Sequence, residues 1–372
     1  MEGPMGELGE TPHSVFVRAA KECVFGYDNK KSALAMQALC RPALPLKAEQ
    51  HMQTTRQEHP ARAHGSAAVI AEISAGLLAP AAHTSPKFLY DSLGSRLFEA
   101  ICELPEYYPT RTEAAIFEAH GAAMSQDIGT GVSLIDLGAG NCAKAASLFP
   151  LLQPAQYVPV DISRDFLTES VTRLQQRFPH IEMTPLGLDF SGGFALPDSV
   201  RSRRRLFFYP GSSIGNFSPE QAIAFLHGLR ANAGDDGGLL IGVDLVKDSA
   251  VLDAAYDDAI GVTAAFNLNM LRHVNHLVGA DFNVRDWQHH AFFNPHAKRI
   301  EMHLEARSAV TVRWQNHERH FESGERIHTE DSYKYTRQSF VSLLEQAGFA
   351  TNRVWTDENN WFAVIYARVI PD

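Results

Sequence analysis

A glycine-rich turn near the middle of the chain is the feature most able to do chemistry. The segment LIDLGAGNCAK, residues 134–144, joins an apolar run to a helix-like segment through Gly138 and Gly140. Glycine lets the backbone approach a ligand closely, and the N-terminus of the following helix favours a polar or anionic group. The pattern therefore predicts a site for a nucleoside cofactor.

Acidic residues end the next two apolar runs, with Asp161 in YVPVDIS and Asp189 in LGLDF. A carboxylate at the end of the neighbouring strand, such as Asp161, can accept hydrogen bonds from both hydroxyls of a ribose. NAD calls for G-x-G-x-x-G, and Ala143 at the last position fits only the looser form of that pattern. S-adenosylmethionine (SAM) needs fewer glycines, and Asp136 adds an acidic group. The pattern favours SAM, while NAD and a turn without a ligand stay open.

The elements around this turn alternate between strands and helices. Short apolar runs predict strands at residues 132–140, 155–163, 183–190, 205–212 and 238–246. Helices are predicted between them at 164–178 and 218–229, the second opened by a capping box of Ser218 and Gln221 with Pro219 at its first position. Such alternation predicts a parallel α/β sheet that binds ligands beyond the carboxyl ends of its strands.

The sequence predicts three parts. Residues 1–65 lack sustained apolar periodicity, so we expect a disordered leader there. Residues 66–247 and 336–372 are expected to form the cofactor-binding domain, with a helical segment at its N-terminal end and a closing edge hairpin. The alternation stops in residues 248–335, which we interpret as an inserted α+β substrate-binding domain.

Composition excludes several classes of protein. The net charge of −10, from 43 acidic and 33 basic residues, opposes binding to nucleic acid or to an anionic membrane. The four cysteines show no CxxC pairing, which indicates a reducing cytoplasm. The 17 histidines show no HExxH or similar pattern, so we expect no metal. No export signal or apolar membrane span is evident, and we expect a cytoplasmic monomer acting on a small molecule.

Five motifs occur along the chain: YDSLGSRLFEAICELPEYYPTRTE, LGAG with Lys144, GSSIGNF, AYDDAIGVTAAFN and IHTEDSYKY. Together they resemble the histidine N-alpha-methyltransferases of ergothioneine biosynthesis, the EgtD family, from Pro86 to Val369. The resemblance implies a Rossmann-like, class I SAM-dependent methyltransferase. It would transfer three methyl groups in succession from SAM to the α-amino nitrogen of L-histidine, making hercynine. Cys142 departs from the general G-x-G-x-G pattern, and Ser213 stands where threonine is expected.

The resemblance also implies site residues. Those for the cofactor are Tyr90, Gly138, Lys144, Asp161, Asp189 and Phe190. Those for the amino acid are Tyr107, Asn216, Tyr256, Glu330 and Ser332.

The chemistry of the second set suits an α-amino acid. The amide of Asn216 can donate to a carboxylate while accepting from an amine, and Tyr256 adds a donor for the carboxylate. Glu330 can accept from an imidazole N–H while Ser332 engages the other ring nitrogen, which would select histidine over an apolar side chain. Methyl transfer needs a neutral, aligned amine rather than a strong base. Tyr107 could relay the departing proton, or the amine could lose it directly to solvent.

Three other functions stay open from the sequence. The first is methylation of another amino acid, such as tryptophan or tyrosine, against which Glu330 argues. The second is an NAD-dependent oxidoreductase, which the glycine pattern and the lack of an evident hydride-transfer acid/base pair disfavour. The third is a non-catalytic cofactor sensor, which would not need Asn216, Tyr256, Glu330 and Ser332 together.

Overall fold

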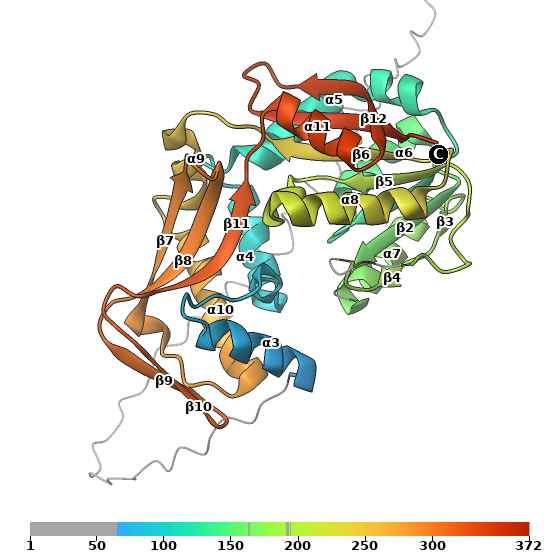
Figure 1. Ribbon diagram of the computed structural model, residues 1–372. Helices are drawn as coiled ribbons and strands as arrows, with labels where there is room; N and C mark the ends of the chain where they lie inside the picture. The colour runs from blue at the N-terminus through green and yellow to red at the C-terminus, as the bar shows by residue number, and fades with distance from the viewer. Residues whose placement is uncertain (1–64, 163, 191–192, 194, 372) are drawn as a thin grey trace, which may run out of the picture. The chain divides into compact units, whose positions relative to one another are not determined.

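A mixed sheet organises the described part of the chain, which in this computed structural model comprises residues 65–162, 164–190, 193 and 195–371 (Figure 1). The strand order is β12-β13-β6-β5-β1-β2-β3, and the short β4 also pairs with β2. Strands β1 to β6 pair in parallel, and β13 runs antiparallel to both β6 and β12. The bounds are β1 (Ser133–Leu137), β2 (Gln156–Asp161), β3 (Glu182–Met183), β4 (Leu186–Gly187), β5 (Arg205–Tyr209), β6 (Gly238–Asp244), β12 (Phe349–Thr356) and β13 (Phe362–Val369).

The predicted strands differ from the observed ones mainly at residues 183–190. In place of one strand, two-residue strands β3 and β4 form on either side of Pro185. Proline has no backbone N–H to donate to a ladder, which accounts for the interruption. Asp189 consequently lies in the loop after β4 rather than at a strand end. The closing hairpin is confirmed, with β12 at the edge of the sheet.

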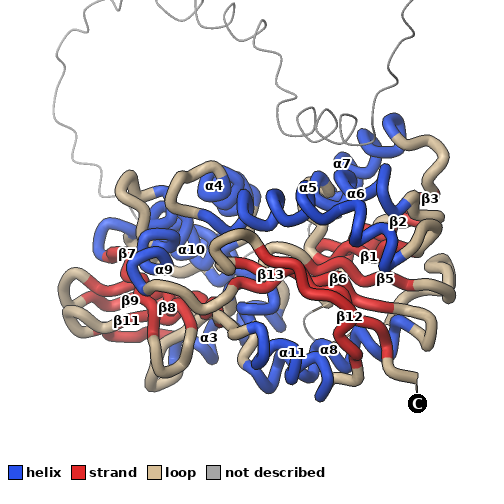
Figure 2. The backbone as a smooth tube through the Cα atoms, turned by 90° about the horizontal axis from the view of Figure 1, so that it is seen from above, coloured by secondary structure: helices blue, strands red, loops and turns tan. Residues whose placement is uncertain are grey.

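Helices cover both faces of this sheet, as the alternation predicts (Figure 2). One face packs against α5 (Tyr108–Ile128), α6 (Ala143–Leu152) and α7 (Arg164–Arg177). The other packs against α8 (Pro219–Ala233) and α11 (Arg337–Gln346). The predicted capping box is present, since the Ser218 side chain accepts from the backbone N–H of Gln221. This sandwich of helices leaves the carboxyl edge of the parallel strands for a ligand.

Residues 248–335 form separate sheets. The strands β7 (Trp287–Asn294), β8 (Arg299–Ala306) and β11 (Arg326–Tyr333) make one antiparallel sheet in the order β11-β8-β7. The strands β9 (Val310–Trp314) and β10 (His317–Phe321) make a hairpin. Two helices, α9 (Ser249–Tyr256) and α10 (Val262–Val278), and the short 3-10 helix η4 (Val284–Asp286) precede these strands in the chain. Two further 3-10 helices, η2 (Pro86–Leu89) and η3 (Ser213–Asn216), lie earlier in the chain, outside residues 248–335.

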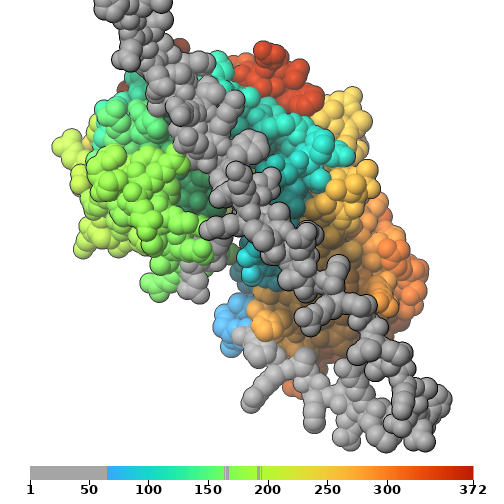
Figure 3. Space-filling view, turned by 180° about the vertical axis from the view of Figure 1, so that it is seen from behind, coloured from blue at the N-terminus to red at the C-terminus, as the bar shows by residue number. Residues whose placement is uncertain are grey.

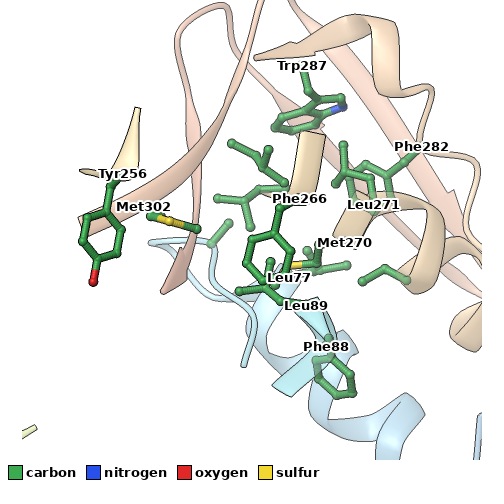
Figure 4. Packing of buried hydrophobic residues seen from close by; sticks show 14 of the residues in the cluster. Leu77, Phe88, Leu89, Tyr256, Phe266, Met270, Leu271, Phe282, Trp287 and Met302 are labelled. Atoms are coloured by element: carbon green, nitrogen blue, oxygen red, sulfur yellow. The ribbon is translucent and has the colours of Figure 1, made fainter. Parts of the chain in front are cut away.

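The first two α-helices of the described chain pack mainly against residues 248–335 rather than against the large sheet. Helices α3 (Ala67–Leu78) and α4 (Ser92–Cys102) share a core with α10 and β7, where Leu77 and Leu89 pack near Phe266 and Met270 (Figure 4). In Figure 3, the teal surface of α4 and α5 lies between the green α6–α7 region and the orange residues after 250. Helices α3 and α4, which we predicted as part of the cofactor domain, therefore pack on the predicted insert, whereas α5 packs on the large sheet. The domain boundaries stay a prediction, and residues 1–64 of the predicted leader lie outside the described residues.

The described residues contain no helix with the length and apolar character that a membrane span requires. Within the same residues, His, Cys, Asp and Glu side chains form no group of three or more arranged to hold a metal ion. Cys102 and Cys142 are free thiols.

Gly242 and Gly228 offer a matched pair of substitutions. A Cβ on Gly242, in β6, would stand 2.1 Å from Oε1 of Glu113, whereas one on Gly228, in α8, would meet nothing within 4 Å. We expect Gly242→Ala to lower the free energy of unfolding by about 1–3 kcal/mol, because strand and carboxylate must move apart. We expect Gly228→Ala to raise it by about 0.5–1 kcal/mol through helix propensity. Urea denaturation measures the free energy of unfolding of both variants. An unchanged free energy in Gly242→Ala would contradict the close approach of Glu113 to this strand.

Candidate active site

The glycine turn leaves its backbone open at the carboxyl edge of the sheet. Gly138 and Gly140 have left-handed φ angles of 71° and 51°. The N–H of Gly140 donates to Oδ2 of Asp161 at 3.0 Å, so the end of β2 adjoins the turn, as the sequence predicts. Nothing lies within 4 Å of a Cβ built on Gly140, and the ring of Phe190 lies 3.9 Å from one built on Gly138. The turn thus forms an open cradle between a carboxylate and an aromatic ring, which fits the nucleoside of SAM.

Cys142 and Asp136, which belong to the segment of the glycine turn, both have buried side chains. Cys142 keeps the left-handed conformation of the glycine it replaces, with φ 61°, and its buried side chain packs in the core. Asp136 does not face the ligand edge. Its carboxyl is buried and accepts from the Tyr157 hydroxyl at 2.7 Å, and burial raises its pKa to about 7. The structure therefore assigns Asp136 to the core of the sheet. Asp189 is exposed in its loop.

Lys144 connects the cofactor edge to the loop that follows β5. Its Nζ donates to Oε2 of Glu113 at 2.7 Å, and Oε1 of Glu113 accepts from the N–H of Gly211 at 2.7 Å. Only 1% of the Glu113 side chain is exposed, so a buried carboxylate is satisfied at both oxygens. Glu113 was not among the predicted site residues, although it ends the motif that contains Tyr107.

The predicted amino-acid residues line one pocket beside this edge. The pocket has about 510 Å³ of empty space, part of it open to solvent, and its wall contains Tyr107, Asn216, Tyr256, Glu330 and Ser332. Glu330 and Ser332 share a face of β11 because strand side chains alternate. Gly211 lines the same pocket, which places it next to Lys144 and Glu113. Tyr90, which the resemblance assigned to the cofactor, also lies in this wall.

Aromatic rings form one side of the pocket. The ring of Tyr90 meets Phe98 and Phe266 edge-on at centroid distances of 5.6 and 5.5 Å. The ring of Tyr107 meets Tyr256 in the same way at 6.2 Å. Figure 4 shows Tyr256 at the end of the apolar cluster, with its hydroxyl pointing away from the cluster. Rings in such an arrangement exclude water and can face a cationic nitrogen.

Glu330 supplies the carboxylate of a wall that otherwise combines aromatic rings with neutral polar side chains. Its Oε1 accepts from Nδ2 of Asn216 at 3.0 Å, and only 8% of the residue is exposed. Burial raises the pKa of Glu330 to about 7, against the opposing effects of Lys334 and Asn216. The second amide hydrogen of Asn216 and its oxygen are left for a ligand.

A buried ionic network lies behind the pocket and was missed in the sequence. Nζ of Lys334 donates to Ser332 Oγ at 2.7 Å and to the Tyr256 hydroxyl at 2.9 Å, and it pairs with Asp244 Oδ2 at 2.8 Å. Lys247 pairs with the other oxygen of Asp244 at 2.5 Å. Burial raises the pKa of Asp244, but the two ammonium groups outweigh it and hold that pKa below its ordinary value. Asp244 ends β6 as Asp161 ends β2, so the same signal could have found it.

The pKa of Glu330 predicts a pH-dependent stability. The native pKa of about 7 exceeds the unfolded value of about 4.3, so the native state binds more protons than the unfolded state between these two pH values. The free energy of unfolding therefore falls as pH rises through this range. We expect Glu330→Gln, which cannot ionise, to gain roughly 1–3 kcal/mol relative to wild type between pH 4.5 and pH 8. Thermal melting of both proteins at the two pH values measures this gain, and a constant difference would contradict the raised pKa.

A doubly wound sheet with an open glycine turn, a carboxylate at the next strand end and an adjoining pocket is the arrangement expected of a class I, SAM-dependent methyltransferase. The chain belongs to the family of histidine-specific, SAM-dependent methyltransferases, whose sequence profile matches residues 69–369. The family resemblance predicted from the motifs is confirmed.

Relatives support this membership over most of the chain. The histidine N-alpha-methyltransferase of Mycolicibacterium smegmatis is 37% identical over 302 residues, which cover 80% of this chain and 93% of the relative. The enzyme of the same name from Mycobacterium tuberculosis is 36% identical over 322 residues, 85% of this chain and 99% of the relative. Ergothioneine biosynthesis protein 1 of Neurospora crassa is 30% identical over 294 residues, 73% of this chain and 32% of that longer protein.

Proposed function

We propose that this enzyme methylates the α-amino nitrogen of L-histidine three times with SAM, giving N,N,N-trimethylhistidine (hercynine) for ergothioneine biosynthesis. The observation that carries the proposal is the buried carboxylate of Glu330, paired with Asn216 in a pocket that is partly lined by aromatic rings. Such a carboxylate favours a side chain with an N–H donor and penalises an apolar one. The names of the two mycobacterial relatives support the same substrate.

The cofactor would lie along the glycine turn. Asp161 would accept from the ribose hydroxyls, Phe190 would pack beside the nucleoside, and Lys144 in the first turn of α6 would attract the carboxylate of SAM. We propose Tyr90 and Asp189 as further contacts on the strength of the family resemblance. When bound, SAM supplies a methyl group on a sulfonium sulfur.

The amino acid would be held at both ends. Asn216 and Tyr256 would bind the α-carboxylate, and the oxygen of Asn216 would orient the amine. Glu330 and Ser332 would bind the imidazole. Holding the amine in line for attack is the main catalytic contribution of these residues.

Tyr107 would act as a donor or relay rather than as a base. Burial raises the pKa of its phenol well above the ordinary value, so the hydroxyl stays protonated at neutral pH. It can therefore pass a proton only while receiving another. Direct loss of the amine proton to water remains the simpler route, and the pH dependence of a Tyr107→Phe variant distinguishes the two.

A second candidate is methylation of another aromatic amino acid, such as tryptophan or tyrosine. The aromatic wall of Tyr90, Phe98 and Phe266 favours it, because flat rings of any kind would pack there. One relative, 25% identical over 315 residues, is named 4-dimethylallyltryptophan N-methyltransferase.

The deciding experiment incubates the purified protein with SAM and a pool of the twenty amino acids and reads product masses. We expect histidine to gain one, two and then three methyl groups, with the trimethyl form accumulating. Methylation of tryptophan or tyrosine in place of histidine would establish the second candidate. The cytoplasmic location and the monomeric state stay predictions, and size-exclusion chromatography tests the second of them.

A further inference from the structure

Lys334 places an ammonium group directly behind the amino-acid pocket. Its side chain is 0% exposed, and its three polar neighbours are Tyr256, Ser332 and Asp244, at 2.9, 2.7 and 2.8 Å. An ammonium carries three hydrogens and cannot accept a hydrogen bond. The three contacts therefore use all of its hydrogens, and both pocket hydroxyl oxygens serve it as acceptors.

This arrangement limits what the two hydroxyl groups can offer a ligand. The oxygens of Tyr256 and Ser332 lie 2.9 Å apart, so one hydroxyl donates to the other. Of their two hydrogens, one is used within the pair and one is left for a bound amino acid. If Tyr256 gives its hydrogen to the substrate carboxylate, Ser332 donates to Tyr256 and can only accept from the substrate.

We infer that Lys334 is a positioning residue for the amino-acid site, which holds Tyr256 and Ser332 so that the pair presents a single hydrogen to the substrate. The inference deepens the proposed function and rests on it. In the proposed pose the side chain of the substrate meets two acceptors, Ser332 and Glu330. An imidazole ring can carry two N–H groups when one proton is shared between the ring and Glu330. An indole has one N–H and leaves one acceptor unpaired, which costs binding.

Lys247 is the matched comparison residue. It is 4% exposed and binds the other oxygen of the same Asp244, and its further contacts are the Tyr108 hydroxyl and the Leu245 carbonyl. A lysine that served only to neutralise Asp244 would be equivalent to Lys247. A lysine that positions the pocket hydroxyls would differ from it in substrate binding.

The experiment is a double-mutant cycle on histidine turnover, with Lys334→Met, Tyr256→Phe, the double variant and Lys247→Met as the control. We expect Lys334→Met to raise KM for histidine about tenfold or more, the scale of a lost charge-assisted contact, while Kd for SAM changes less than about threefold. In the Tyr256→Phe background the same substitution should cost much less, because the hydroxyl it positions is gone. The ratio of kcat/KM for histidine to that for tryptophan should fall more in Lys334→Met than in Lys247→Met.

The inference would be overturned if the effects of Lys334→Met and Tyr256→Phe on KM simply multiplied in the double variant. It would also be overturned if Lys334→Met and Lys247→Met changed KM, and the histidine-to-tryptophan ratio of kcat/KM, by equal amounts. If Lys334→Met does not fold, the double variant Lys334→Met with Asp244→Asn removes the buried carboxylate charge that has lost its partner. Its control is Lys247→Met with Asp244→Asn, and the two are compared in KM for histidine and in the histidine-to-tryptophan ratio of kcat/KM. Failure of the proposed function has a separate signature, since wild-type protein would then leave histidine unmethylated. If the wild-type enzyme does methylate histidine but the two substitutions act independently in the cycle, only the role assigned to Lys334 is contradicted.

Discussion

Replacing Glu330 with alanine is expected to lower kcat/KM for histidine by about 100-fold or more, which corresponds to roughly 3 kcal/mol of transition-state binding. The carboxylate is buried, accepts a hydrogen bond from Asn216 at 3.0 Å and lines the pocket. A water molecule in the space left by alanine would not supply the negative charge that the imidazole N–H meets in wild type. Turnover of tryptophan or phenylalanine should fall less, or rise, because the group that penalises an apolar ring is removed.

The measurement is the ratio of kcat/KM for histidine to that for an aromatic competitor, before and after the substitution. Glu330→Gln is the matched control, because its amide oxygen can still accept from Asn216 while the charge is absent. We expect it to lose histidine turnover but to keep more of it than alanine does. An unchanged ratio in the alanine variant would mean that Glu330 has only a structural role.

The second large effect is expected at the cofactor edge, where Asp161→Ala should weaken SAM binding by roughly 1.5–3 kcal/mol, about 10- to 150-fold. The carboxylate would accept from the ribose hydroxyls, and it also fixes the glycine turn through the N–H of Gly140. Loss of the ribose contact and loss of the hydrogen bond to the turn should each weaken SAM binding. Isothermal titration calorimetry with SAM measures the loss.

Two controls separate the contributions of Asp161. Asp161→Asn keeps an acceptor for Gly140, so it isolates the charge-assisted contact with the ribose. Asp189→Ala removes an exposed carboxylate in the loop after β4, and we expect a smaller loss there. Unchanged SAM affinity in Asp161→Ala, or tight NAD binding by wild type, would remove the basis of the cofactor assignment.

Local features were the most predictable from the sequence. The capping box at Ser218 and the glycine turn depend on residues a few positions apart, and each formed as expected. The proximity of Asp161 to the turn followed from a simple rule, that adjacent parallel strands end at one edge. The gathering of Asn216, Tyr256 and Glu330 in one pocket was anticipated only through the family resemblance, because they lie on η3, α9 and β11.

The remaining differences have physical causes that a sequence pattern does not carry. All residues of β1 are buried, so apolar patterning could not reveal which face of the sheet receives Asp136. The pairing of Lys334 with Asp244 needs the residue after β11 to approach the end of β6, a long-range contact with no local signal, whereas Lys247 lies only three residues from Asp244. The packing of α3 and α4 on α10 is long-range in the same sense.

The contact between Glu113 and Gly242 has a consequence for how this protein can evolve. A side chain at position 242 would overlap the carboxylate that holds both Lys144 and the loop of Gly211. The two positions are therefore not free to mutate in either order. Shortening residue 113 first would relieve the closest of these contacts, but that step removes the partner of Lys144. A lineage that retains Glu113 therefore pays a stability cost for any side chain in the middle of β6, an inner strand of the sheet.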